Sequence, residues 1–245
     1  MTHLHRFLTP EALSAGAASF ILDLAQKAVR DRGRFIWALS GGRTPENLYR
    51  LLSKPPYRDK MPWQNTLIFW SDERCVPPDD PQNNALMAQK ALLDKVEIPD
   101  SNIFRIPTGP APEEAARQYE RTLRKVFEAE APRFDLIMLG VGADGHTASL
   151  FPGTQALRES TRWVCENFVE TQRMYRITFT FPLLNQARCI LFLVSGKDKA
   201  NILKEIRRDE LPADAYPARM VRPEHGETYW YADEDAAALL GSDKR

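Results

Sequence analysis

Residues 35–45 read Phe-Ile-Trp-Ala-Leu-Ser-Gly-Gly-Arg-Thr-Pro, and they are the most informative part of the chain for its fold. Its first five residues form an uninterrupted apolar run, which is typical of a strand buried on both faces. The two glycines allow a tight turn, and Pro45 favours the first turn of a following helix. A strand that leads through a short polar loop into a helix is the unit from which α/β proteins are built.

Further apolar runs predict more strands, and helical patterns separate most of them. The expected strands are Phe35–Leu39, Thr66–Trp70, Phe134–Leu139, Arg176–Thr180 and Cys189–Val194. The expected helices are Thr9–Arg30 with Thr9 as its cap and a stop near Gly33, Asn84–Val96, Pro112–Ala131 and Lys197–Arg207. This alternation predicts an α/β fold, Rossmann-like, with a mainly parallel central sheet and helices on both faces. No repeat or low-complexity linker divides the chain, so we expect a single domain over residues 1–245.

The overall composition excludes several classes of protein. Thirty-three basic residues balance 33 acidic ones without a long basic run, so the electrostatic footprint of a nucleic-acid binder is missing. No stretch approaches the roughly 20 apolar residues of a membrane span, and the first residues lack the apolar block of a secretory signal. Cys75, Cys165 and Cys189 are odd in number and widely separated, which fits reduced thiols. We expect a cytoplasmic protein that contacts neither nucleic acid nor membrane.

The first candidate loop is Ser40-Gly41-Gly42-Arg43-Thr44. Its glycines let the backbone approach an anion, and the positive end of the following helix favours a phosphate. The hydroxyl groups of Ser40 and Thr44 add donors, and Arg43 adds a cation. The alternative is an ordinary tight turn that needs glycine. The loop is not a Walker P-loop, because no Gly-Lys-Ser or Gly-Lys-Thr follows.

A second polar loop, Ser71-Asp72-Glu73-Arg74, directly follows the expected strand Thr66–Trp70. Three adjacent charges at the end of a strand must face solvent, pair with one another or serve a ligand. Ligands of α/β sheets bind beyond the carboxyl ends of the strands, which favours the last possibility. An ion-paired strand end explains the triplet equally well by itself.

The third loop runs from Gly140 to Gly153 and contains Gly-Val-Gly-Ala-Asp-Gly-His. Its glycines match the dinucleotide fingerprint, but two residues argue against a dinucleotide. Asp144 would place a carboxylate where a pyrophosphate should lie, and Pro152 would break the helix that the fingerprint requires.

The chemistry that this loop does offer is a histidine with a carboxylate two residues away. His146 can take a proton from water near neutral pH, and Asp144 can orient its ring. His3 and His5 lie in an expected terminal tail, and no His-Glu-x-x-His pattern predicts a metal site. A structural or merely exposed histidine is the alternative for His146.

In five blocks taken in order, the sequence resembles the 6-phosphogluconolactonase family over almost its whole length. The blocks are Ser40–Pro45, Asp72–Arg74, Gly140–Gly153, Arg176–Asn185 and Gly196–Ala200. The resemblance implies the fold that this family shares with glucosamine-6-phosphate deaminases. It also implies hydrolysis of a phosphorylated sugar lactone, 6-phosphogluconolactone, to 6-phosphogluconate, without a metal or other cofactor.

The resemblance also implies roles for individual residues. His146 would be the general base, supported by Asp72 and Asp144. The residues that would hold the substrate are Ser40, Gly41, Gly42, Arg43, Thr44, Arg74, Asn84, Arg176 and Lys197. Arg43 stands where the family more usually has serine, and Asn83 stands where we expect serine before Asn84.

Two other functions compete with the lactonase. One is an aminosugar-phosphate deaminase or isomerase of the same fold, and the other is a sugar-phosphate sensor without catalysis. In the deaminases a glutamate follows the loop histidine by five residues, whereas this chain has Phe151 there, which cannot transfer protons. Whether the chain is a monomer or a weak homo-oligomer stays open.

Overall fold

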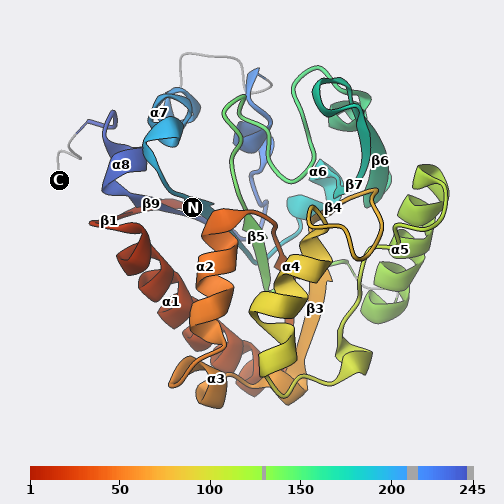
Figure 1. The fold of residues 1–245 in the computed structure, drawn as a ribbon, viewed down its shortest axis with the longest axis horizontal. Coiled ribbons are helices and arrows are strands. Elements are labelled where there is room, and N and C mark those ends of the chain that lie inside the picture. Colours follow the sequence, from red (N-terminus) through yellow and green to blue (C-terminus); the bar gives the residue numbers. More distant parts are fainter. Residues whose placement is uncertain (129–130, 209–214, 242–245) are drawn as a thin grey trace.

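A six-stranded parallel sheet forms the centre of the computed structural model, which describes residues 1–128, 131–208 and 215–241 (Figure 1). The strand order is β1-β9-β8-β5-β2-β3, and every neighbouring pair is parallel. The strands are β1 (Thr2–Phe7), β2 (Phe35–Leu39), β3 (Thr66–Trp70), β5 (Leu136–Leu139), β8 (Cys189–Val194) and β9 (Glu227–Asp233). The predicted α/β fold with a parallel central sheet is confirmed.

A smaller antiparallel sheet lies beside the carboxyl end of β3, with the order β4-β7-β6. Its strands are β4 (Asp72–Arg74), β6 (Val164–Val169) and β7 (Met174–Phe179). One prediction is therefore wrong, and another is confirmed with a different pairing. Residues 72–74 form a strand rather than the expected loop. The strand expected at Arg176–Thr180 is present as β7, and it pairs antiparallel in this second sheet. A turn with a left-handed residue, Arg173 at φ 48°, joins β6 to β7 and sets their pairing.

Helices cover both faces of the large sheet, as expected. The α-helices are α1 (Pro10–Arg32), α2 (Arg43–Leu52), α3 (Tyr57–Lys60), α4 (Asn84–Ala91), α5 (Pro112–Phe127), α6 (Phe181–Leu184), α7 (Ala200–Arg207) and α8 (Glu234–Ala237). Tyr49 of α2 packs on Trp37, whereas Tyr119 of α5 packs near Phe69. In the pairing of β2 with β3, Trp37 lies opposite Ile68, the residue before Phe69. Successive side chains of a strand point to opposite faces of the sheet, so Trp37 and Phe69 lie on opposite faces, and so do α2 and α5.

The first helix obeys its sequence signals closely. The Thr9 side chain accepts a hydrogen bond from the Ala12 amide at 3.2 Å, and Pro10 occupies the first turn. Gly33 ends the helix at φ 77°, a left-handed conformation that favours glycine. Two other predicted helices are shorter than expected. Helix α4 ends at Ala91 before a 3₁₀ turn, Leu93–Lys95, and α5 ends at Phe127, while residues 129–130 lie outside the described part of the chain.

The prediction of a terminal tail around His3 and His5 is wrong, because both lie in β1. Their rings contact Tyr229 and Tyr231 of β9, with centroids 4.8 Å apart for His3–Tyr229 and 5.0 Å for His5–Tyr231. Successive side chains alternate between the two faces of the edge strand β1, so His3 and His5 lie on the same face. On that face Tyr229 and Tyr231 also pack with Phe20 of α1.

Residues from both sheets meet in one hydrophobic core, which includes Trp37, Trp70, Phe134 and Phe179. Burying a large apolar side chain stabilises a fold by about 1.5–3 kcal/mol, so this core fixes the strand ends on which the polar loops depend. No helix within the described ranges is long and apolar enough to cross a bilayer.

Candidate active site

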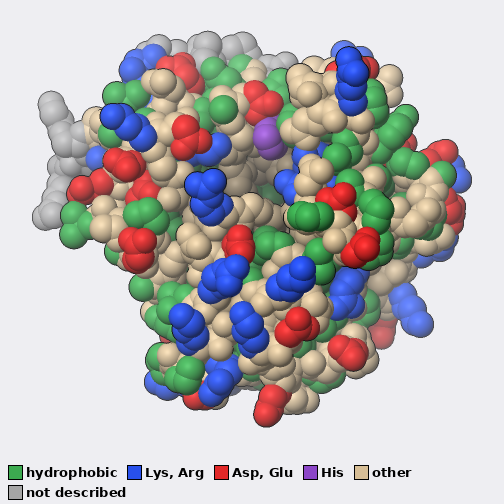
Figure 2. Space-filling view, in the orientation of Figure 1, with side chains coloured by type: hydrophobic (Ala, Val, Ile, Leu, Met, Phe, Trp, Pro, Cys, Tyr) green, Lys and Arg blue, Asp and Glu red, His purple; other side chains and the backbone are tan. Residues whose placement is uncertain are grey.

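The carboxyl ends of four neighbouring strands, β8, β5, β2 and β3, carry the polar loops to one edge of the large sheet. The strand order reverses between β2 and β5, since β3 lies on the far side of β2. Ligands of open α/β sheets bind at such a reversal. Figure 2 shows the surface hollowed beyond the amino end of α2, with basic side chains around the hollow.

The glycine loop after β2 leaves the amino end of α2 free of side-chain caps. Gly42, at φ 103°, precedes the helix, and no side chain caps the helix there. Arg43 and Thr44 lie in its first turn. Unpaired amides at a helix amino end bind phosphate, so this geometry agrees with the anion loop expected from the sequence.

Two contacts fix the shape of this loop. The Tyr49 hydroxyl accepts from the Ser40 amide at 3.1 Å and donates to the Ser40 carbonyl oxygen at 2.8 Å. A Cβ atom on Gly41 would lie 1.9 Å from Oδ1 of Asn84, so only glycine fits beside that amide. The role of Tyr49 could not be recognised from the sequence, where it reads as one apolar position of a helix.

Asp72 connects the glycine loop to the loop Gly140–Gly153, which holds His146 and is the candidate catalytic loop. Its carbonyl oxygen accepts from Nδ2 of Asn84 at 3.1 Å, and its Oδ2 accepts from the Ser149 hydroxyl at 2.6 Å. Nη1 of Arg176 lies 3.9 Å from the same Oδ2. All four side chains are buried. Ser149, a possible nucleophile by residue type, instead donates a hydrogen bond to Asp72.

Glu73 organises the start of α4. Its carboxylate accepts from the amides of Arg74, Asn84 and Ala85, each at 2.8 Å. Burial raises the pKa of Glu73 to about 7, although the three backbone donors act in the opposite direction. In the sequence, Glu73 is recognisable only as an acidic residue next to Asp72. Its contact with the amide of Ala85, 12 residues later, could not be predicted from the sequence.

The antiparallel sheet places two arginines side by side, because Arg74 of β4 pairs with Arg176 of β7. Nη1 of Arg74 donates to the Gln82 carbonyl oxygen at 2.6 Å, and Nη2 of Arg176 donates to the Gln172 side chain. Nε of each arginine is buried without a hydrogen-bond partner in the described chain. Burial lowers the pKa of Arg176, and the charge of Asp72 opposes that shift.

The loop after β5 holds His146 and Asp144 against each other. Nδ1 of His146 lies 2.6 Å from Oδ1 of Asp144. A Cβ atom on Gly142 would lie 2.0 Å from Nδ1, so glycine is required for the imidazole to fold back over the loop. Partial burial raises the pKa of Asp144, but the hydrogen bond and charge of His146 outweigh it, so the pKa lies below its usual value. An ionised Asp144 therefore faces Nδ1.

Phe151 covers one face of the imidazole. The two rings are stacked, with centroids 3.9 Å apart and an interplanar angle of 22°. The guanidinium of Arg176 lies 5.7 Å from the centroid of Phe151. A series of contacts thus runs from Gly41 through Asn84, Asp72 and Arg176 to the catalytic loop.

Lys197 follows β8 at the same edge of the sheet. The buried carboxylate of Asp233 holds the preceding loop, since it accepts from the Ser195 hydroxyl at 2.5 Å and from the Gly196 amide at 3.1 Å. In the described chain, no hydrogen bond or ion pair joins Lys197 or Arg43 to the other candidate residues. Asp233 is recognisable in the sequence only as a helix cap.

Other candidates have simpler explanations. Burial raises the pKa of the Cys75 thiol to about 11, which disfavours a reactive thiolate. Over residues 1–128, 131–208 and 215–241, no group of three or more His, Cys, Asp or Glu side chains is placed to hold a metal ion.

Comparisons with known proteins agree with this geometry. Residues 8–230 match the family model described as glucosamine-6-phosphate isomerases/6-phosphogluconolactonase. A 6-phosphogluconolactonase of Synechocystis is 46% identical over 218 residues, 87% of this chain and 88% of that protein. The crystal structure of 6-phosphogluconolactonase from Thermotoga maritima has a TM-score of 0.83 at 30% identity, and covers 95% of this chain and 100% of that one. A monomeric glucosamine-6-phosphate deaminase shares the fold, with a TM-score of 0.81 at 22% identity over 97% of this chain and 99% of that chain.

Proposed function

The chain belongs to the glucosamine-6-phosphate isomerase/6-phosphogluconolactonase family, and we propose that it hydrolyses 6-phospho-D-glucono-1,5-lactone with a water that His146 activates. Curated relatives named 6-phosphogluconolactonase are 40–46% identical to it over most of its length. It is a lactone hydrolase of the oxidative pentose phosphate pathway. The observation that supports the catalytic role of His146 is its contact with Asp144, beside the glycine loop that follows the adjacent strand β2.

The contact with Asp144 determines which nitrogen of His146 acts. Because the carboxylate is ionised, Nδ1 carries a proton and donates it to Oδ1, which leaves Nε2 as the proton acceptor. The stacked Phe151 holds the ring in one plane. Asp144 also stabilises the imidazolium that forms during the reaction.

The reaction then needs one attack and one bond cleavage. Nε2 takes a proton from water as the water oxygen bonds to the lactone carbonyl carbon. The tetrahedral intermediate collapses, the ring C–O bond breaks, and the proton returns from Nε2 to the leaving oxygen. A positioned general base supplies about 10² to 10⁴ in rate, and stabilising the oxyanion adds about 10² to 10³. Arg176, Lys197 and backbone amides are the candidates for the oxyanion contact.

We assign the substrate phosphate to the glycine loop and the nearby cations. The backbone of Ser40, Gly41 and Gly42, the Thr44 hydroxyl and the amino end of α2 provide donors. Arg43, Arg74, Arg176 and Lys197 provide positive charge, and Asn84 and Asp72 position the loops. The three free cysteines suit a cytoplasmic location, which we also propose.

The test is release of acid from freshly prepared lactone above the spontaneous background. We expect unphosphorylated gluconolactone to show a kcat/KM lower by about 10² or more, because two charge-assisted contacts of about 1.5 kcal/mol each are lost. Inorganic phosphate should compete with the substrate, less well at high salt. Equal rates on both lactones would contradict the phosphate assignment, and no release above background would contradict the activity.

A further inference from the structure

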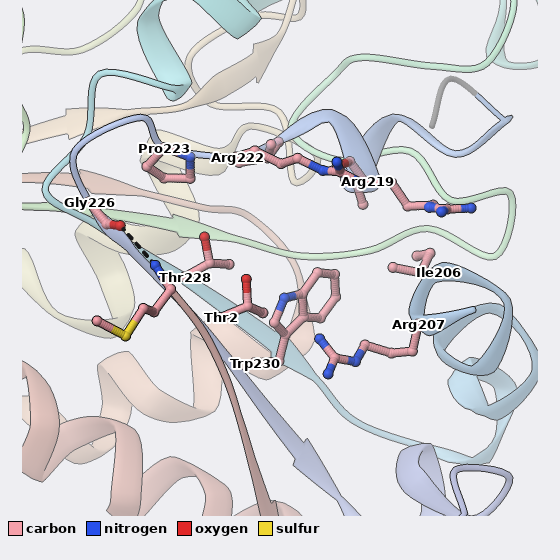
Figure 3. A pocket seen from close by; sticks show the side chains of 12 residues that line it. Thr2, Ile206, Arg207, Arg219, Arg222, Pro223, Gly226, Thr228 and Trp230 are labelled. Carbon is pink, nitrogen blue, oxygen red and sulfur yellow. Dashed lines mark hydrogen bonds between the residues drawn. The ribbon is translucent and has the colours of Figure 1, made fainter. Parts of the chain in front are cut away.

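A cavity of about 490 Å³ lies on the face of the large sheet that α7 covers (Figure 3). Thr2 of β1 and Thr228 and Trp230 of β9 line one side of it. Thr2 and Thr228 lie near the beginning of their strands and Trp230 lies midway along β9, whereas the loops of the candidate active site follow the opposite, carboxyl ends. The end of α7 and the segment Ala218–Pro223 line the other sides, so the cavity is separate from the candidate active site.

The lining of this cavity is strongly cationic. Arg207, Arg219 and Arg222 all contribute to it, and among residues 1–128, 131–208 and 215–241 no acidic residue lines it. Figure 3 shows the three arginines around the same space, which Ile206 and Trp230 also border. Arg207 and Arg222 are exposed, so bulk water can screen their charge.

Arg219 is different, because its side chain is only 7% exposed. Its Nη1 is buried without a hydrogen-bond partner, and no carboxylate of the described residues pairs with it. Arg176 is equally buried, but it faces Asp72. An unpaired buried guanidinium is costly, and such groups in folded proteins normally have an anionic partner. Arg219 therefore leaves an uncompensated positive charge beside this cavity.

We propose that this cavity is a second site, which binds a small phosphorylated metabolite. The planar fork of a guanidinium matches phosphate oxygens, and the hydroxyl groups of Thr2 and Thr228 are further donors on the wall. The volume is that of a site for a small organic molecule, so a bare phosphate ion would leave most of it unfilled.

One residue connects this cavity to the catalytic loop. Ala218 lines the cavity, and its amide donates to the Gly145 carbonyl oxygen at 3.0 Å. Gly145 directly precedes His146 and lies against Tyr216, since a Cβ atom on it would be 2.5 Å from that ring. A ligand that moves Arg219 moves the backbone that supports His146. This effector role rests on the assignment of His146 as the base, whereas the binding site does not.

Pyrophosphate is the probe for the binding test, with the full-length chain in a calorimeter. Saturating 6-phosphogluconate fills the active site first. We expect one pyrophosphate per chain to bind under these conditions. Arg207→Gln should weaken binding at least about tenfold, because it removes a charge-assisted contact. Arg208→Gln is the matched control, since Arg208 is the next residue, equally exposed, and pairs with Glu205 outside the cavity. It should bind as the wild type does.

Arg219→Met provides a second, independent measurement. It should abolish pyrophosphate binding, yet the unliganded protein should melt no lower than the wild type, because an unpaired buried charge is removed. Failure of pyrophosphate to bind, complete displacement by 6-phosphogluconate, or equal affinity in Arg207→Gln and Arg208→Gln would each overturn the second site.

The effector role is tested by kcat at saturating lactone, where competition at the active site has no effect. Pyrophosphate should change kcat of the wild type and of Arg208→Gln, but not of Arg207→Gln. Binding without any change in kcat would overturn the effector role. A chain that binds pyrophosphate beside bound product but has no lactonase activity would instead contradict the proposed function, so the two failures are distinguishable.

Discussion

The two sheets contribute to the candidate site in different ways. The parallel sheet supplies loops, and the decisive contact within them joins His146 to Asp144, two residues apart. The antiparallel sheet supplies Asp72 and Arg176, and Asp72 reaches Ser149 across 77 residues. The loop contact depends on local backbone shape, whereas the sheet contacts depend on strand pairing. Substitutions in the loop should therefore affect chemistry, and substitutions in the small sheet should in addition affect stability and its pH dependence.

The largest effect is expected from His146→Ala. Loss of the proton acceptor should lower kcat by about 10² to 10⁴. The affinity for 6-phosphogluconate, measured by calorimetry, should change much less, because the phosphate contacts remain. His5→Ala is the control, since that ring lies in β1 against Tyr231. Near-normal turnover of His146→Ala would remove this residue from the mechanism.

Arg176→Met tests the small sheet. Without the guanidinium, the buried carboxylate of Asp72 keeps its hydrogen bond from Ser149 but loses the nearby positive charge. Breaking a buried ion pair costs about 3–5 kcal/mol, and the 3.9 Å separation argues for the lower end. Urea unfolding should show this loss, and Arg173→Met, an exposed arginine three residues earlier, should not. Equal stability of the two variants would mean that Asp72 needs no partner.

The sequence predicted the parallel sheet and its loops because each signal is local. Apolar runs, glycines and Pro45 lie next to one another along the chain, and so do Asp144 and His146. It did not predict β1 or β9. The alternating histidines of β1 resemble a polar tail until Tyr229 and Tyr231 of β9 are placed beside them. Of the second sheet the sequence predicted β7 but not β4 or β6, and three-residue β4 is too short to show a period.

The same distinction applies to the site residues. The candidates in the glycine loop and at His146 were recognisable by type and spacing. Tyr49, Glu73 and Asp233 were not, because each acts through a hydrogen bond to a backbone brought near by folding. Positions that support a site from a distance carry no pattern in one sequence.

Glu73→Gln should change the pH dependence of stability. The pKa of Glu73 is about 7 in the folded chain and about 4.5 when unfolded, so the folded chain binds more protons between these values. The stabilisation that Glu73 contributes to the folded state is therefore complete below about pH 4.5 and is lost as the pH rises through about 7. Between these two pH values the unfolding free energy should fall by at most about 1.4 kcal/mol per pH unit because of Glu73.

Unfolding free energies at pH 5 and pH 8 measure this term. The fall in stability between them should be smaller in Glu73→Gln than in the wild type. Glu114→Gln should keep the wild-type slope, because hydrogen bonds from Arg121 and Gln118 lower the pKa of that exposed carboxylate below this window. Parallel curves for the wild type and Glu73→Gln would show that Glu73 does not titrate there.

The smallest effect is expected for Phe151→Glu, which should produce no deaminase activity. Phe151 stands five residues after His146, where the deaminases carry an acid for opening the sugar ring. Lactone hydrolysis needs no such proton relay, because the ring opens as the ester bond breaks. Here the phenyl ring stacks on the imidazole and lies below Arg176, so its position is determined by packing.

The wild type should release no ammonia from glucosamine 6-phosphate while lactone hydrolysis is fast, and Phe151→Glu should release none either, because one acid does not supply the other substrate contacts. Phe151→Leu separates the loss of stacking from the gain of charge, and both variants should lower lactonase kcat by freeing the imidazole ring. Deamination by the wild type at a rate comparable to hydrolysis would overturn the lactonase assignment, and deamination gained by Phe151→Glu alone would show that a single position separates the two activities.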